Sequence, residues 1–349
     1  MEQHAHPLRW HLSVDPHRVG NAVMSTFDPV PIEDGEARFA LESFALSANN
    51  VTYVQTAGDF GYDKLFDNPA GRMIPPVWGY AVVVESRSAL EIGSRWYGLW
   101  PAGSHLTVRP KMTRAGFRDV TARRNALNPL YNGYLPEGPD DTRAQITQAS
   151  LRPLHFLAYV VSRNQKHELK RYARVVVTSA SSKTSTALAW ELRDLNPIGL
   201  TSAKRVGFVQ GTGFWTRVLP YTHTTDIGAG SVVVLDVAGS EDILTTIRTR
   251  PDFGETRVIG IGFTHPVFAH ASERELFFAP DRVAAVVARL GAAAFERDLE
   301  ESARQFLSRT SATYDVNRVT PDKLVQFWAE ISRGEVDGSL LNGCAVNAR

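Results

Sequence analysis

The chain has a single cysteine, Cys344, among 349 residues. One thiol cannot form an internal disulfide and cannot supply the cysteine ligands of a structural zinc site. No stretch approaches the roughly 20 apolar residues that a membrane-spanning helix needs. The charges are balanced, with 38 Lys and Arg against 37 Asp and Glu. We therefore expect neither a nucleic acid nor a membrane surface as a partner.

The first ten residues, MEQHAHPLRW, begin with an acidic residue and contain no apolar core. They do not match a secretory signal, so we expect a cytoplasmic protein. A chain of 349 residues exceeds what one hydrophobic core usually supports, which predicts two domains.

The two parts of the chain differ in pattern. Residues 1–150 contain the strand-like stretches ARFALESFALSANNVTYV, VWGYAVVVESRS and SRWYGLWPAGSHLTVRP, which predict a small antiparallel barrel. After residue 150 strands alternate with helices, and the expected strands are 175–178, 205–209, 231–236 and 257–263. Near-continuous apolar strands between helices predict a parallel sheet covered on both faces. The predicted fold class is α/β.

The C-terminal part contains a helix and a final strand. Thr320-Pro321-Asp322 starts the helix and Gly334 ends it. Its apolar residues follow helical spacing: Leu324, Phe327, Trp328 and Ile331. We expect these elements to pack on the N-terminal barrel. Residues 1–150 and 281–349 would then form one discontinuous domain, and residues 151–280 the nucleotide-binding domain.

The stretch RYARVVVTSASSKTSTALAWEL, from Arg171 to Leu192, has the outline of a nucleotide-binding strand, loop and helix, but it lacks the usual glycines. Small residues can also let backbone N–H groups and a helix N-terminus approach a pyrophosphate. Hydroxyls would donate to phosphate oxygens, and the one cation would neutralise charge. The candidate residues are Thr178, Ser179, Ala180, Ser181, Ser182, Lys183, Thr184 and Ser185. The alternative is that they only cap a helix.

The type of cofactor depends on the segment after the next strand. The expected segment, 209–213, contains no acid of the kind that binds the ribose hydroxyls of NAD, and Arg217 is the next charge. This pattern favours NADP(H), with NAD(H) less favoured. The candidates here are Gln210, Gly211, Thr212 and Arg217. Later strands should end at the same sheet edge, which adds Ala238, Gly239, Gly262 and Thr264.

Six stretches in order resemble motifs of the medium-chain dehydrogenase/reductase superfamily: ALSANNVTYVQTAGDFG, IPPVWGYAVVVES, VVVTSASSKTSTALAWEL, SVVVLDVAGSEDIL, TRVIGIGF and TPDKLVQFWAEISRGEVDGSLL. The chain is most similar to the zinc-independent quinone/enoyl-reductase-like branch, and within it to an uncharacterised bacterial family with a SASSKT loop. The resemblance implies a GroES-like β-barrel catalytic domain and a Rossmann doubly wound sheet. Zinc-dependent members have His–Glu after the glycine of the second motif, whereas Tyr80-Ala81 follows Gly79 here, so we expect no zinc.

The resemblance also implies an active site between the domains, with the nicotinamide facing ANNVTY. Asn49, Thr52 and Tyr53 are the catalytic candidates there, because they can hydrogen-bond a substrate oxygen. The alternative is that Asn49 and Asn50 shape a turn while Tyr53 packs in the core.

The implied activity is a zinc-independent, NADP(H)-dependent reduction of a small molecule with an activated double bond or carbonyl: an enone, a quinone or an enoyl thioester. A non-redox enzyme, such as a lyase or an isomerase, and a binding protein without turnover remain open. The resemblance further implies a homodimer that joins nucleotide domains near residues 257–263 and 275–278.

Overall fold

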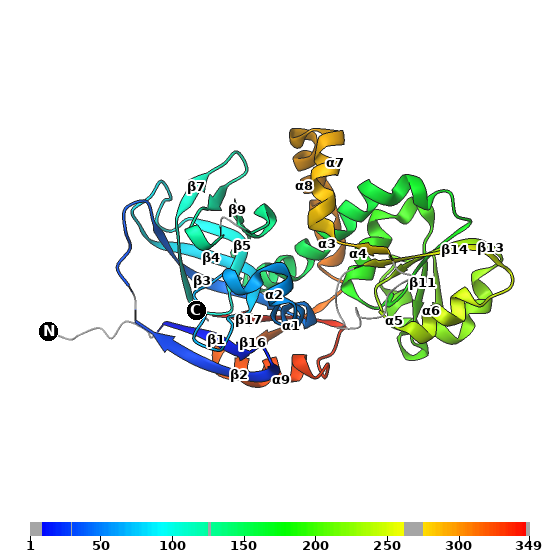
Figure 1. Cartoon of the computed structure of the whole chain (residues 1–349), viewed down its shortest axis with the longest axis horizontal. Helices are drawn as coiled ribbons and strands as arrows, with labels where there is room; N and C mark the ends of the chain where they lie inside the picture. The colour runs from blue at the N-terminus through cyan, green and yellow to red at the C-terminus, as the bar shows by residue number, and fades with distance from the viewer. Residues whose placement is uncertain (1–8, 29, 125–126, 262–274, 347–349) are drawn as a thin grey trace. The chain divides into compact units, whose positions relative to one another are not determined.

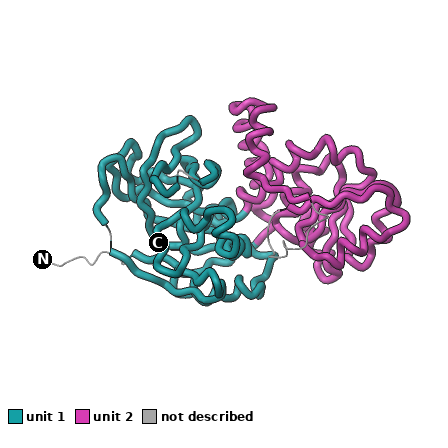
Figure 2. The backbone as a smooth tube through the Cα atoms, viewed as in Figure 1, with its two compact units in different colours: residues 1–150, 315–349 teal, residues 151–314 magenta. Residues whose placement is uncertain are grey.

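The computed structural model describes residues 9–28, 30–124, 127–261 and 275–346. The chain folds into two compact units (Figure 2). Unit 1 comprises Met1–Ser150 and Asp315–Arg349, and unit 2 comprises Leu151–Tyr314. Unit 1 is therefore discontinuous in sequence. The helix α3 (Thr142–Leu169) begins in unit 1 and ends in unit 2.

Unit 1 consists mainly of strands (Figure 1). Besides the start of α3, its α-helices and strands in the described residues are β1 (Arg9–Asp15), β2 (Arg18–Phe27), β3 (Ala37–Leu46), α1 (Ala48–Gln55), α2 (Ala57–Phe60), β4 (Pro76–Ser86), β5 (Arg95–Pro101), β6 (His105–Val108), β7 (Pro110–Met112), β8 (Phe117–Asp119), β9 (Gly133–Pro136), β16 (Asp315–Val319), α9 (Leu324–Ser332) and β17 (Leu340–Ala345). Its short helices are η1 (Tyr62–Lys64), η2 (Ala122–Arg124), η3 (Pro129–Tyr131) and η8 (Pro321–Lys323). In the described residues β1 pairs with β2, and a nine-stranded sheet has the order β16-β17-β3-β4-β5-β9-β8-β7, with β6 beside β3.

The C-terminal elements complete unit 1. Strand β17 pairs antiparallel with β3 and parallel with β16. Helix α9 buries its apolar face in the same core as β3, β4 and β5. The indole of Trp328 on this face also donates a hydrogen bond to the backbone oxygen of Val19 on β2, at 2.7 Å. The i, i+3, i+4, i+7 spacing read in the sequence thus faces the core of unit 1.

Unit 2 alternates strands and helices. Besides the end of α3, its elements in the described residues are β10 (Arg174–Val177), α4 (Lys183–Glu191), the short helix η4 (Arg193–Leu195), β11 (Ile198–Thr201), the short helix η5 (Ala203–Arg205), α5 (Val206–Gly211), β12 (Arg217–Pro220), the short helix η6 (Tyr221–Ile227), β13 (Gly230–Asp236), α6 (Glu241–Arg248), β14 (Phe253–Ile261), β15 (Glu275–Phe277), α7 (Ala279–Leu290) and α8 (Ala292–Thr310). In the described part of the unit, the strands form a six-stranded sheet in the order β12-β11-β10-β13-β14-β15. All neighbouring strands are parallel. This order is that of a Rossmann sheet.

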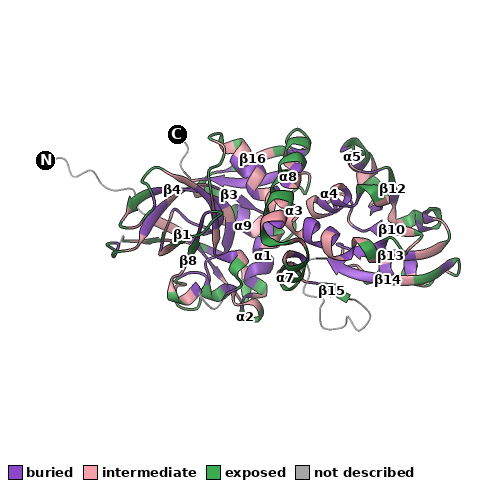
Figure 3. Cartoon of the chain, turned by 90° about the horizontal axis from the view of Figure 1, so that it is seen from above, coloured by how far each residue is buried: buried purple, intermediate pink, exposed green. Residues whose placement is uncertain are grey.

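The central strands of this sheet are buried, as Figure 3 shows for β10 and β13. Val176 and Val177 on β10 and Val232 to Leu235 on β13 have no exposed surface. Continuous burial explains why the sequence of these strands is apolar without alternation.

One predicted strand is wrong. Residues 205–209 end η5 and form most of α5, and the second strand along the chain is β11 instead. A side chain at Gly199 of β11 would place its Cβ 2.8 Å from atoms of Ala180 and Trp215. The glycine therefore allows both groups to pack closely on a strand of only four residues.

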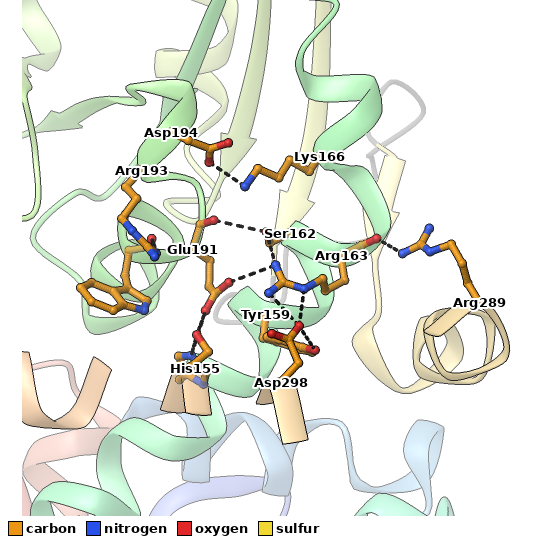
Figure 4. A network of polar contacts seen from close by, with 12 residues as sticks. His155, Tyr159, Ser162, Arg163, Lys166, Glu191, Arg193, Asp194, Arg289 and Asp298 are labelled. Carbon is orange, nitrogen blue, oxygen red and sulfur yellow. Dashed lines mark hydrogen bonds and ion pairs between the residues drawn. The ribbon is translucent and has the colours of Figure 1, made fainter. Parts of the chain in front are cut away.

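The second domain boundary also differs from the prediction. Residues 281–314, which the sequence analysis assigned to the barrel domain, lie in unit 2. Figure 4 shows how α8 is bound to α3 within that unit. Asp298 of α8 accepts hydrogen bonds from Tyr159 at 2.8 Å and from Arg163 at 3.0 Å. These partners lie more than 130 residues apart in sequence, so no local pattern reveals them.

Glu191, at the end of α4, is the centre of this network (Figure 4). Its buried carboxylate lies 3.0 Å from His155 Nε2, accepts a hydrogen bond from the Ser302 hydroxyl and lies 3.6 Å from Arg163. The same histidine nitrogen faces both Glu191 and Ser302, whereas a catalytic relay uses both ring nitrogens. We therefore interpret the network as structural: it fixes α4 against α3 and α8.

Candidate functional site

The carboxyl ends of β10 and β13 form the switch point of the parallel sheet. From β10 the chain passes through β11 to β12 on one side of the strand, and then crosses to β13 on its other side. Ligands of open α/β sheets bind at this point. The loop at residues 178–182 and the N-terminus of α4 follow β10 directly, so the candidate loop lies there.

The loop turns at Ser179, which has the left-handed φ of +52°. This conformation costs a residue with a side chain about 1–2 kcal/mol, and glycine normally occupies it. Two contacts hold the turn. The Ser179 N–H donates to the Tyr221 hydroxyl at 2.9 Å, and the Ala180 N–H donates to the backbone oxygen of Leu200 at 2.8 Å. Tyr221, which sequence reasoning missed, thus helps to compensate for the missing glycine.

Several loop hydroxyls are used within the protein. Ser182 Oγ accepts the Ser185 N–H at 3.1 Å and so caps α4, and Ser182 also donates to the Ser185 hydroxyl. Ser185 in turn donates to the backbone oxygen of Thr178 at 2.9 Å. The Thr178 hydroxyl donates to Asp236 at 2.8 Å. The capping alternative therefore holds for Ser182, and these three hydroxyls stabilise the loop itself.

Backbone donors remain at the loop. Within the described residues, the N–H groups of Ser181 and Thr184 have no hydrogen-bond acceptor. Both lie at the start of α4, where unpaired N–H groups and the helix dipole favour an anion. The half-buried Lys183 adds a cation to the same turn.

The end of β13 lies beside the loop. Thr178 Oγ1 accepts hydrogen bonds from the N–H groups of Val237 at 2.8 Å and Ala238 at 3.0 Å. The Gly239 N–H donates to Asp236 at 3.2 Å. The structure thus brings Ala238 and Gly239 next to Thr178, as the sequence analysis expected. Gly262 and Thr264 lie outside the described residues.

Four predicted cofactor residues lie away from this edge: Gln210, Gly211, Thr212 and Arg217. Arg217 begins β12 opposite Ile198, the first residue of β11. Since parallel strands begin at one edge and end at the other, Arg217 lies at the amino edge, where it donates to the backbone oxygen of Asp226. Helix α5 runs from the carboxyl edge of the sheet back toward the start of β12, so the helix ends on the side away from the loop. The structure therefore does not bring Arg217 to the loop, and the assignment of the other three residues to the site stays a prediction.

The residues that do follow β11 at the carboxyl edge were missed. They are Ser202, Ala203, Lys204 and Arg205, a segment with two cations and no acid. Lys204 is exposed and Arg205 is half-buried. In the sequence, the pair of cations after a short apolar run indicates this segment, but only if that run is first recognised as strand β11.

The catalytic candidates lie on α1 of unit 1. Tyr53 is buried, its ring is edge-on to Tyr62, and the Trp78 indole N–H donates to its hydroxyl at 3.4 Å. Burial raises the pKa of Tyr53, and hydrogen bonds with Trp78 and Asn49 offset part of this shift. The Thr52 hydroxyl donates to its own helix, so it does not join Asn49 and Tyr53.

The neighbouring Asn50 has a structural role. It accepts the Ser47 N–H at 2.7 Å and donates to the backbone oxygen of Pro76 at 2.9 Å. It therefore fixes the start of α1 against β4, which agrees with the turn-shaping alternative.

The segment around Gly79 and Tyr80 is tightly packed. A Cβ on Gly79 would lie 2.3 Å from the backbone oxygen of Ser43, and the buried Tyr80 donates to Gln148 at 2.6 Å. Cys344 lies in the core, and burial raises its pKa to about 12. Among the described residues, no group of three or more His, Cys, Asp and Glu side chains is placed to hold a metal ion.

No helix in the described ranges of the chain is both long enough and apolar enough to cross a membrane.

The fold defines an α/β protein with a GroES-like unit and a Rossmann unit, and the predicted fold class is confirmed. The chain belongs to the family described as "Protein of unknown function (DUF2855)", whose model matches residues 44–337. No curated protein matches the chain.

Solved structures of low sequence identity share this fold. CurA from Vibrio vulnificus, in complex with NADPH, is 10% identical with a TM-score of 0.63, and the match covers 98% of this chain and 100% of that one. The CurK enoyl reductase is 13% identical with a TM-score of 0.57, covering 97% and 99%. A thermostable alcohol dehydrogenase from Pyrobaculum aerophilum is 10% identical with a TM-score of 0.56, covering 97% and 100%. These matches establish the fold alone.

Proposed function

We propose that the chain is a zinc-independent, NADP(H)-dependent oxidoreductase that reduces an activated double bond or carbonyl of a small molecule, such as an enone, a quinone or an enoyl thioester. The observation that carries the proposal is the loop at the sheet's switch point. There, the N–H groups of Ser181 and Thr184 have no acceptor among the described residues. One relative in fold is a complex with NADPH, which supports the choice of cofactor.

The residues present fit a dinucleotide. The amides of Ser181 and Thr184, the dipole of α4 and the Lys183 ammonium would hold the pyrophosphate. The segment after β11 has no acid to bind the ribose hydroxyls of NAD, and it supplies Lys204 and Arg205 for a 2′-phosphate. Lys204 and Arg205, rather than Arg217, are therefore the cations that would favour NADP(H).

When bound, the nicotinamide would supply a hydride to the electrophilic carbon of the substrate. The part of this chain is to hold the dinucleotide and to stabilise charge on the substrate oxygen. Tyr53 is the candidate for the second task, because its phenol is protonated at neutral pH and can donate a hydrogen bond to that oxygen. Asn49 would orient that hydroxyl.

A nucleotide-binding protein without turnover is the second candidate. The observation in its favour is that Tyr53 is buried and already bonded to Trp78, while Thr52 bonds within α1. A non-redox enzyme on the same scaffold would also bind the nucleotide without consuming it. Loss of NADPH absorbance when an enone, quinone or enoyl thioester is added would separate the first function from both alternatives.

Binding is tested by titrating NADPH and NADH against indole fluorescence. Trp215 is a suitable reporter, because Trp215 and Ala180 of the loop both pack on Gly199. Lys183→Ala should weaken both nucleotides, since both carry the pyrophosphate. A charge-assisted contact is worth about 1.5–3 kcal/mol, or roughly tenfold to more than a hundredfold in affinity. Unchanged affinity for both nucleotides would contradict the assigned loop.

A homodimer is part of the proposal. In the described part of the sheet, β15 is an edge strand, and its Leu276 is 39% exposed. Pairing with the same edge of a second copy would cover unpaired backbone groups. A monomer mass in light scattering at micromolar concentration would argue against it.

A further inference from the structure

Tyr314 is a buried aromatic residue at the end of unit 2, directly before β16 of unit 1. Although it is distant in sequence from the loop, its side chain contacts the first turn of α4. The Tyr314 hydroxyl donates a hydrogen bond to Thr186 Oγ1 at 3.0 Å. The Lys183 ammonium lies over the Tyr314 ring, 5.7 Å from its centroid. Phe208 of α5 packs near the same ring, with centroids 6.5 Å apart.

The hydroxyl contact supports the cap of α4. Thr186 accepts from Tyr314 and donates to the backbone oxygen of Ser182 at 3.1 Å, and Ser182 is the N-cap residue. Each hydrogen bond in such a chain polarises the next. Tyr314 therefore helps to fix the residue at which the loop becomes a helix.

The ring contact limits where the cation can go. Lysine has a long, flexible side chain, and an aromatic face within about 6 Å attracts its ammonium. The ring therefore favours positions of the ammonium beside the first turn of α4, where Ser181 and Thr184 present their N–H groups. A lysine held in this way loses less conformational freedom when it meets an anion.

We propose that Tyr314 is a positioning residue for the pyrophosphate of the dinucleotide, acting through Lys183. The inference rests on the proposed function and adds a residue that the family motifs in this sequence do not include. It predicts that the affinity for NADPH and NADH depends on the aromatic ring more than on the hydroxyl.

The test compares dissociation constants of both nucleotides for variants of the full chain. Tyr314→Leu should raise both constants about three- to tenfold, the size of a partly desolvated cation–π contact. Tyr314→Phe keeps the ring and should stay within about twofold of wild type. If Tyr314→Leu does not fold, Tyr314→Met, which fills the space without an aromatic face, replaces it. The matched control is Tyr172→Leu, which removes a tyrosine that is hydrogen-bonded to Glu255 and should leave both dissociation constants unchanged.

A double-mutant cycle shows whether the effect passes through the lysine. In a Lys183→Ala background, Tyr314→Leu should have no further effect on either dissociation constant. The proposal would be overturned if the losses of nucleotide affinity in Lys183→Ala and Tyr314→Leu added fully in the double variant. Equal losses of affinity in Tyr314→Phe and Tyr314→Leu would also overturn it. If wild type binds and Lys183→Ala weakens binding while Tyr314→Leu is silent, this inference fails and the proposed function stands. If wild type binds neither nucleotide, both fail.

Discussion

Replacement of Lys204 by alanine should weaken NADPH binding and leave NADH binding unchanged. Lys204 follows β11 at the carboxyl edge of the sheet, beside the loop that leaves β10. Only NADPH carries the 2′-phosphate that this cation would meet. Because Lys204 is exposed, its contact should lie near the lower end of charge-assisted interactions, about 1.5 kcal/mol or roughly tenfold in affinity.

Arg217→Ala is the matched control, because it removes a cation from the opposite edge. The four residues of β11 separate the two edges by about 10 Å at a rise of roughly 3.3 Å each. At that separation two unit charges in water interact by about 0.4 kcal/mol, which screening at physiological ionic strength reduces to about 0.1 kcal/mol. Arg217→Ala should therefore change NADPH affinity by less than about 1.5-fold.

Both variants are measured by fluorescence titration with NADPH and NADH, with Lys204→Arg as the charge-preserving control. An equal loss of NADH affinity in Lys204→Ala would show that the lysine acts on the loop rather than on the 2′-phosphate. A tenfold loss in Arg217→Ala would refute the assignment of sheet edges.

Three further predictions concern stability, packing and metal content. Glu191→Ala should lower the free energy of unfolding by about 3 kcal/mol, against at most about 1 kcal/mol for Glu300→Ala in an exposed ion pair, as thermal melting can measure. Burial raises the pKa of Glu191, but its hydrogen bonds and nearby charges outweigh this and hold the pKa below the ordinary 4.5. The stability that Glu191 contributes is therefore complete above pH 4.5 and is lost as the pH falls through the lower pKa of the folded state. In Glu191→Ala the melting temperature should depend less on pH below 4.5 than it does in wild type. Gly199→Ala should lower both melting temperature and NADPH affinity, whereas Gly207→Ala, with nothing within 4 Å of the new Cβ, should not reduce either. Elemental analysis should find no stoichiometric zinc, and one tightly held zinc per chain would contradict this.

The strongest sequence signals came from elements with a continuous buried stretch or one buried face. Strands β10 and β13 are apolar along most of their length, β14 is apolar in its second half, and α9 keeps one apolar face, so the pattern of each indicates its type. Strand β11 is too short for such a pattern and contains Gly199. The apolar run after it, 206–209, fits a strand or one turn of a helix equally well. Because of that ambiguity, the sequence analysis sought the contacts to the 2′-phosphate after residues 205–209 instead of after β11.

The remaining differences depend on contacts that are distant in sequence. The residues of α8 that bind Glu191 and Arg163 are polar, so they resemble an ordinary solvated helix face until their partners are known. Likewise, composition alone does not reveal that the Ser182 and Ser185 hydroxyls are used within the loop. The sequence predicted the place of the loop, whereas its hydrogen bonds required the structure.

A crystal structure of the protein grown with NADPH would show directly whether the loop after β10 binds the dinucleotide. We expect the pyrophosphate to accept hydrogen bonds from the N–H groups of Ser181 and Thr184, with the 2′-phosphate beside Lys204. A pyrophosphate bound elsewhere on the chain, or no nucleotide at a saturating concentration, would contradict the proposed function.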